Sequence, residues 1–247
     1  MNYSWNWGVL FEQTGIGNEL YIHWMITGLG WLLLIGSIAW AIAMVVGTIF
    51  GIMRTLPNNT ARAIGTAYVT FFSYSTACST VLLVLYRAWL LTPTIQEWWY
   101  KDLSPNTSAM LSASIGLGLF TAARIVEQVR TGIESLPDGQ INAAYALGFS
   151  IPQVYKEVLL PQAFRIILPP LSSELTNCFK NASVASLVGV MELISQTKTI
   201  SEYTQNSIEI YTYATIIYLV FNLSLIAIMG LIERKLRVPG LIAGGQK

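Results

Sequence analysis

The chain has 247 residues and a formal net charge of +1, and 53% of its residues are hydrophobic while only 11% are charged. Because a soluble domain carries about 25% charged residues, this composition excludes an ordinary water-facing surface and predicts an all-α integral membrane protein. The near-zero net charge gives no reason to expect a nucleic-acid partner. The single histidine, His23, leaves little material for histidine-based catalysis or metal binding, so we expect neither an enzyme nor a bound cofactor.

The first membrane span is predicted directly after an aromatic N-terminal segment. Residues 1–23 contain no Lys or Arg but several Trp and Tyr residues, a composition typical of a membrane interface. Residues 24–53 then carry no charged side chain over 30 positions. Such a stretch makes about 45 Å of helix, which is enough for one tilted span.

Further apolar stretches predict four more spans, at 64–91, 108–130, 163–190 and 211–232. The expected organisation is a periplasmic segment at 1–23, a transmembrane domain of five helices at 24–234 and a cytoplasmic tail at 235–247.

The polar, turn-rich segment 131–161 separates the third and fourth spans and predicts two short helices. Asp138 is expected to cap the first helix, and Gly148 to end it, because glycine readily takes the left-handed conformation found at helix ends. Ser150 and Gln153 have the spacing of a capping box for the second. Both helices are much shorter than the roughly 20 residues of a span, so we expect them at the membrane surface. They would suit docking to a soluble partner; an ordinary interhelical loop is the alternative.

The distribution of Lys and Arg predicts the orientation of the chain. With the N-terminus outside, the inner segments hold nine basic residues: Arg54, Arg62, Arg130, Lys156, Arg165, Arg234, Lys235, Arg237 and Lys247. The outer segments hold Lys101 and Lys198. This bias follows the positive-inside rule and predicts that segment 131–161 faces the cytoplasm.

Several polar side chains fall inside the predicted spans. A charge at the centre of a span costs about 2.5–3.5 kcal/mol even on lenient scales, so such residues usually pair with one another or line a watery path. Glu127 and Arg130 are three residues apart, and a purely structural ion-pair ladder with Arg124 is one interpretation. The candidates for a substrate path are Arg124, Asn177, Lys180, Asn181 and Ser183.

The motif in segment 131–161 resembles the cytoplasmic signature loop of ABC-importer permeases, EAA-x3-G-x9-I-x-LP. Asn142-Ala143-Ala144 stands in the place of E-A-A, Gly148 follows after three residues, and Val158, Leu160 and Pro161 complete the spacing. Residues 127–140 and 180–193 are similar to the polar amino-acid uptake group, and most of all to glutamate/aspartate importer permeases.

This resemblance implies a type I, MetI-like importer fold with a cytoplasmic coupling helix, in a bacterial inner membrane. It also implies a homologous permease subunit or second copy, a dimer of ABC ATPases that binds ATP and Mg, and a periplasmic amino-acid-binding protein. The residues implied in ATPase coupling are Gly139, Asn142, Ala143, Ala144, Gly148, Leu160 and Pro161. Asn142 replaces the usual glutamate, and we expect docking to survive this change. Arg124 stands where many relatives carry an aromatic residue, and a cation there would suit an acidic substrate.

One stretch, Ser73 to Thr92, departs from the family pattern RNxPLLVQ. A back-translation shifted by one nucleotide restores RIPLLVQLFFWYFIVPGFLP, so we hypothesise a compensated frameshift. A coding strand that cannot yield the shifted sequence would end this hypothesis.

The sequence therefore predicts the membrane-spanning subunit of an ATP-driven importer for a polar, acidic amino acid. An ion-coupled secondary amino-acid transporter and a non-transporting membrane anchor are the alternatives.

Overall fold

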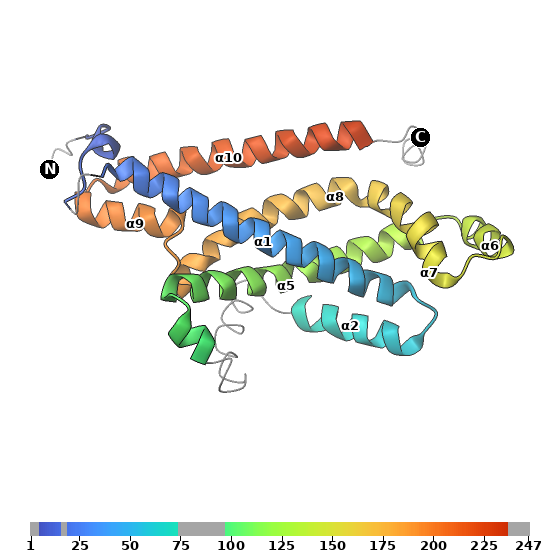
Figure 1. Cartoon of the computed structure of the whole chain (residues 1–247). Helices are drawn as coiled ribbons and strands as arrows, with labels where there is room; N and C mark the ends of the chain where they lie inside the picture. The colour runs from blue at the N-terminus through green and yellow to red at the C-terminus, as the bar shows by residue number, and fades with distance from the viewer. Residues whose placement is uncertain (1–4, 16–18, 74–96, 237–247) are drawn as a thin grey trace. The chain divides into compact units, whose positions relative to one another are not determined.

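The structure is a computed structural model that describes residues 5–15, 19–73 and 97–236 (Figure 1). The regular structure of these residues is helical, apart from one isolated antiparallel bridge between Gln13 and Leu20, and turns and short irregular segments connect the helices. The predicted all-helical class is therefore confirmed for the described part of the chain.

The helices differ greatly in length. The α-helices are α1 (Tyr21–Thr55), α2 (Asn59–Ser73), α5 (Pro105–Glu134), α6 (Asp138–Ala146), α7 (Ile151–Gln153), α8 (Leu160–Asn181), α9 (Leu193–Thr204) and α10 (Ser207–Leu236). In the described ranges, η1 (Val9–Phe11) and η5 (Ala182–Val188) are 3-10 helices, and η3 (Trp98–Asp102) and η4 (Val154–Leu159) are π-helices.

Among the described residues, three helices are long and apolar enough to cross a membrane: Tyr21–Thr55, Pro105–Glu134 and Ser207–Lys235. A fourth candidate is the pair Ile151–Val188 and Leu193–Thr204, bent by 53° at the break between them. These correspond to the first, third, fifth and fourth predicted spans. The predicted second span begins in α2, but residues 74–96, which also hold most of the hypothesised frameshift, lie outside the described residues.

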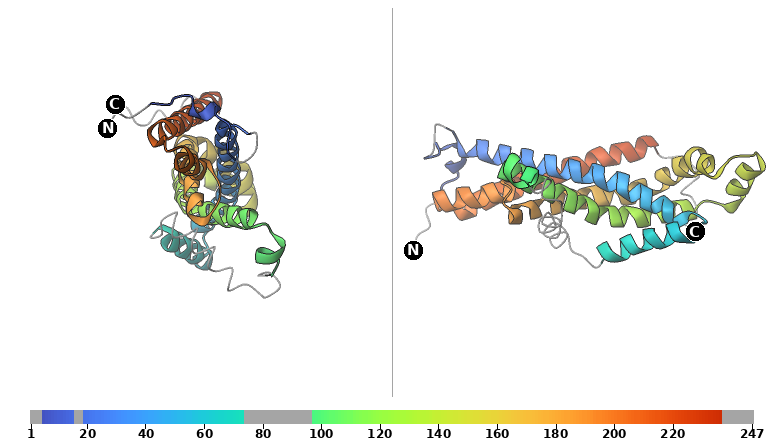
Figure 2. Two further views of the ribbon diagram at one scale, coloured as in Figure 1. Left: turned by 90° about the vertical axis from the view of Figure 1, so that its left-hand side faces the viewer. Right: turned by 60° about the horizontal axis from the view of Figure 1, so that its bottom comes forward.

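The chain divides into two compact units, and the long helices contribute to both. The first unit comprises residues 1–39, 77–117 and 178–225. Its apolar cluster joins η1, the start of α1, α9 and the start of α10, segments that can be followed in Figure 2. The buried members are Val9, Leu10, Tyr21, Met25, Leu193, Ile200, Ile210 and Ala214.

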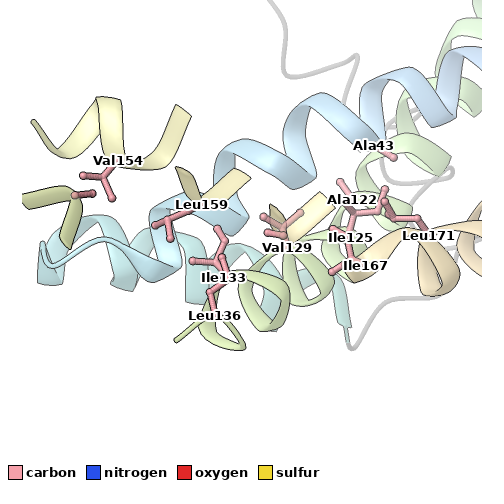
Figure 3. Packing of buried hydrophobic residues seen from close by; sticks show 12 residues of the cluster. Ala43, Ala122, Ile125, Val129, Ile133, Leu136, Val154, Leu159, Ile167 and Leu171 are labelled. Carbon is pink, nitrogen blue, oxygen red and sulfur yellow. The ribbon is translucent and has the colours of Figure 1, made fainter. Parts of the chain in front are cut away.

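The second unit comprises residues 40–76, 118–177 and 226–247, and it contains most of the predicted functional residues. Its core joins the second half of α1 to α5, α6, η4 and α8 (Figure 3). The buried members are Ala43, Ala122, Ile125, Val129, Ile133, Leu136, Ala144, Val154, Leu159, Ala163, Ile167 and Leu171.

Glycine allows α1 and α5 to approach closely in this unit. A Cβ atom on Gly47 would lie 2.7 Å from Cβ of Ile125, and one on Gly51 would lie 2.7 Å from Cβ of Val129. Both glycines and both partners are four residues apart, so each pair lies on one face of its helix. Small residues of this kind let helix backbones pack tightly in membrane proteins.

α2 folds back along the second half of α1 (Figure 1). The Phe50 and Tyr68 rings stack with their centroids 4.4 Å apart, and the Tyr68 hydroxyl donates a hydrogen bond of 2.7 Å to the Leu119 carbonyl oxygen. α2 is therefore attached to both α1 and α5.

The second short helix predicted in segment 131–161 is not separate from the fourth span. Helical structure runs without a break from Ile151 to Val188, and the stretch Val154–Leu159 is π-helical. Pro161 explains this irregularity, because it has no N–H to donate to the carbonyl four residues earlier. The extra residue shifts the buried face: Val154 and Leu159 are five apart, and Ala163, Ile167 and Leu171 then follow at intervals of four.

Candidate functional site

Segment 131–161 begins with a helix whose start differs from the prediction. α6 starts at Asp138, and the capping position belongs to Pro137, which is extended with φ −62° and ψ 132°. The Pro137 carbonyl accepts the first helical hydrogen bond, from the Gln140 N–H at 3.0 Å. Asp138 is therefore the first helical residue, where its charge favours the positive end of the helix dipole, and the prediction that it caps α6 is wrong.

The predicted end of this helix is confirmed. Gly148 has φ +82°, the left-handed conformation that glycine adopts without strain. Its N–H donates to the Tyr145 carbonyl at 2.9 Å, and the Phe149 N–H donates to the Ala144 carbonyl at 3.1 Å. Together these two bonds form a Schellman motif, so Gly148 sets the direction in which the chain leaves α6.

The capping box predicted for the following helix is also present. The Ser150 N–H and the Ser150 hydroxyl both donate to Gln153 Oε1, at 2.8 and 2.7 Å. Pro152 lies in the first turn of this helix, where its missing N–H is tolerated. Segment 131–161 is therefore held at each turn by its own local bonds.

Buried side chains anchor the segment to the second unit. Ala144, Val154 and Leu159 belong to the core cluster, and α6 packs against η4. Figure 3 shows Leu159 close to Ile133 of α5. The Gln162 side chain also donates a hydrogen bond of 2.8 Å to Gln140 Oε1, which joins α8 to α6.

Other side chains of the same segment are large, apolar and exposed. We call Tyr145, Leu147, Phe149 and Ile151 the apolar surface set; each is exposed, and Leu147 reaches 77%. Large exposed hydrophobic side chains gathered in one place mark an interaction surface. These residues lie on the connection between two candidate spans, at the end of the second unit where α6 and α7 project (Figures 1 and 2).

The coupling residues predicted from the motif do not share one environment. Ala144 is buried and Leu160 is half-buried. The others are exposed: Gly139, Asn142, Ala143, Gly148 and Pro161. Sequence reasoning did not single out Leu147, Phe149 or Ile151, although three large apolar residues in a polar, turn-rich loop were a usable signal.

A chain of ion pairs lies at the end of α5. Glu127 pairs with Arg54 of α1 and, at 3.0 Å, with Arg130, which in turn pairs with Glu134 at 2.6 Å. The predicted pair of Glu127 with Arg130 is therefore confirmed. Arg54 was not predicted as a partner, because it lies 73 residues away in sequence.

These ion pairs border an open cleft of about 460 Å³ in the second unit. Its lining comes from α1, α2, α5, α6 and η4: Arg54, Thr55, Arg62, Thr66, Arg130, Ile133, Glu134, Leu136, Asp138, Ile141, Tyr155 and Leu159. On the wall of this cleft the Tyr155 hydroxyl donates a hydrogen bond of 3.1 Å to Thr55 Oγ1.

Arg124, a predicted substrate-path residue, is paired inside the second unit. Its guanidinium lies 3.2 Å from the Glu174 carboxylate of α8 and 5.2 Å from the centroid of the Phe120 ring. The Arg124 side chain is 46% exposed, whereas that of Glu174 is 15% exposed. Arg124 therefore pairs with Glu174 rather than with Glu127, three residues along the same helix.

The other predicted path residues lie along one stretch of chain. Asn177 is half-buried and belongs to the second unit, whereas Lys180, Asn181 and Ser183 belong to the first. Lys180 is exposed, and its carbonyl oxygen accepts a hydrogen bond of 2.8 Å from the Ser183 hydroxyl. Asn181 and Ser183 are half-buried.

Comparison with known proteins gives a consistent result. Residues 43–238 match the family model described as "Binding-protein-dependent transport system inner membrane component". The chain is 40% identical to the glutamate/aspartate import permease protein GltJ of Escherichia coli strains K12 and CFT073, over 99% of this chain and 100% of the relative. It is 29% identical to the glutamate/aspartate import permease protein GltK of strain CFT073, over 87% of this chain and 94% of the relative.

A solved structure of an amino acid ABC transporter with histidines has the same fold. The TM-score is 0.68 at 23% sequence identity, with 87% of this chain and 95% of that chain covered.

The fold and these matches define an inner-membrane permease subunit with the MetI-like fold of ABC importers. The chain belongs to the family of binding-protein-dependent transport system inner membrane components. The ion-coupled secondary transporter, one of the two alternatives that the sequence left open, receives no support from these comparisons.

Proposed function

We propose that this chain moves glutamate or aspartate across the inner membrane, driven by ATP hydrolysis on separate ATPase subunits. The similar proteins GltJ and GltK, both named as glutamate/aspartate import permeases, support this class of substrate. We infer that the chain hydrolyses no ATP and holds no cofactor itself, and that ATP and Mg bind to the ATPase dimer.

Segment 131–161 is the proposed ATPase-docking element, with α6 as the cytoplasmic coupling helix. The observation that carries this proposal is the division of its side chains: Ala144, Val154 and Leu159 are buried in the core, while the apolar surface set is exposed. When a bound protein moves a segment anchored in this way, the helices packed against it, α1, α5 and α8, move with it. The contact surface with the ATPase then includes or borders Gly139, Asn142, Ala143 and Gly148. Leu160 and Pro161 begin α8, the helix that follows the segment and moves with it.

We propose five spans, of which residues 64–91 form the second, with the N-terminus in the periplasm and residues 235–247 in the cytoplasm. The excess of basic residues on one side supports this orientation. The transmembrane domain is then 24–234, and residues 1–23 face the periplasmic binding protein.

A second permease subunit completes the proposed assembly. GltJ and GltK of one Escherichia coli strain are both named as glutamate/aspartate import permeases, and this chain is similar to both. This favours a heterodimer of homologous permeases over two copies of one chain.

Arg124 is the proposed contact for the side-chain carboxylate of the substrate, with Asn177, Lys180, Asn181 and Ser183 lining the path. The ion pair with Glu174 supports this role, because the Arg124 guanidinium donates to a carboxylate at 3.2 Å while nearly half of its side chain stays exposed. A substrate carboxylate would compete with Glu174 for the same guanidinium.

Docking and transport are tested with the complete complex in proteoliposomes. Leu147→Asp is expected to reduce co-purification of the ATPase at least tenfold, because it places a charge in an apolar contact. Glu202→Gln, at an exposed site in the first unit, is the control and should leave co-purification unchanged. Normal co-purification of Leu147→Asp, or glutamate uptake by this chain alone on an ion gradient, would contradict the proposal.

A further inference from the structure

The last turn of α1 is connected to two different parts of the second unit by consecutive residues. Arg54 pairs with Glu127 of α5, and Thr55 accepts a hydrogen bond from Tyr155 of η4. Thus one helical turn contacts both the segment proposed to bind the ATPase and a predicted membrane span.

The hydrogen bond between Tyr155 and Thr55 has a defined direction. The Thr55 hydroxyl donates its proton to the Ile52 carbonyl at 2.9 Å, so its oxygen is left to accept from the Tyr155 hydroxyl at 3.1 Å. A serine at position 55 keeps both functions, whereas a valine keeps the shape and loses both.

The backbone of η4, which carries Tyr155, is fixed by buried neighbours. Val154 next to it is fully buried, and Leu159 is 2% exposed. Both pack in the same core cluster because the π-helical turn brings residues five apart to one side. The Tyr155 ring is half-buried on the wall of the cleft, so it moves with the backbone of η4.

The end of α1 that carries Thr55 is also fixed in place. The close contacts at Gly47 and Gly51 and the ion pair of Arg54 with Glu127 fix the second half of α1 to α5. A displacement applied to Thr55 is therefore shared by both helices instead of being absorbed by the bending of one turn.

We infer that Tyr155 is a positioning residue that passes the movement of segment 131–161 to the α1–α5 pair through Thr55. This inference rests on the proposed function, since it presumes that the ATPase acts on this segment. It assigns Tyr155 to transmission rather than to docking.

The test measures substrate molecules transported per ATP hydrolysed, with the assembled complex in proteoliposomes and radiolabelled glutamate. Tyr155→Phe and Thr55→Val should each lower this ratio about fivefold, which corresponds to about 1 kcal/mol, the net worth of one hydrogen bond. Thr55→Ser should keep the wild-type ratio. The double variant should equal either single variant, since both remove the same bond. Tyr211→Phe, which removes a hydroxyl from an exposed tyrosine in the first unit, is the control.

ATPase co-purification separates this inference from the docking proposal. It should be unchanged in Tyr155→Phe and Thr55→Val and reduced in Leu147→Asp. A wild-type transport ratio in Tyr155→Phe, additive effects in the double variant, or loss of the ATPase from Tyr155→Phe would each overturn the inference. If Tyr155→Phe fails to insert into the membrane, Thr55→Val and Thr55→Ser still test the inference. Equal numbers of substrate molecules transported per ATP in these two variants would overturn it.

Discussion

Replacing Gly51 by alanine is expected to weaken the packing of α1 against α5. The new Cβ would lie 2.7 Å from Cβ and Cγ1 of Val129 and 3.2 Å from the Val126 carbonyl oxygen. Because carbon atoms in contact prefer about 3.5–4.0 Å, the helices must separate by roughly 1 Å. Overpacking of this kind costs about 1–3 kcal/mol, and the better helix propensity of alanine returns about 0.5–1 kcal/mol.

The net loss, about 1 kcal/mol from the middle of these ranges, corresponds to a Tm lower by roughly 2–4 °C for a chain of this size. Thermal unfolding of the purified chain in detergent measures it. Gly30→Ala is the matched control, because it lies on the same helix and its Cβ would meet nothing within 4 Å. A Tm for Gly51→Ala equal to or above that of Gly30→Ala would refute the reasoning.

Three further variants test the ion pairs, the turn after α6 and the substrate path. Glu127→Gln should lower the Tm by several degrees, because Arg54 and Arg130 both lose their shared carboxylate. The control is Glu97→Gln, whose ion pair with Lys101 is exposed on both sides. It should leave the Tm within about 1 °C of the wild-type value, since surface ion pairs contribute little to stability. Gly148→Val should reduce ATPase co-purification several-fold, since a β-branched residue is strained at φ +82°; retention equal to that of Gly230→Ala, an open site on α10, would count against the turn. Arg124→Ala should raise the apparent KM for glutamate at least tenfold, and an unchanged KM would remove Arg124 from the path.

Local features were predictable from the sequence. Gly148, the capping box of Ser150 with Gln153, and the pair of Glu127 with Arg130 each depend on residues within a few positions of one another. Asp138 was assigned wrongly because a capping residue also needs an extended backbone and a carbonyl that accepts the first helical hydrogen bond. Pro137 has both.

Long-range contacts were not predictable. The partners of Arg54, Arg124 and Tyr155 lie 73, 50 and 100 residues away, and no periodicity in one chain specifies such pairs. The π-helical turn before Pro161 was missed for a related reason. A proline usually indicates the start of a new helix, whereas here the extra residue in the turn lets the helix continue.

The central claim is that segment 131–161 faces the cytoplasm and presents its apolar surface set to an ATPase. Leu147→Cys, made in a Cys78→Ala, Cys178→Ala background, tests it directly with a membrane-impermeant maleimide. We predict labelling in inverted membrane vesicles and protection when the ATPase is bound. Labelling in intact spheroplasts but not in inverted vesicles would contradict the account.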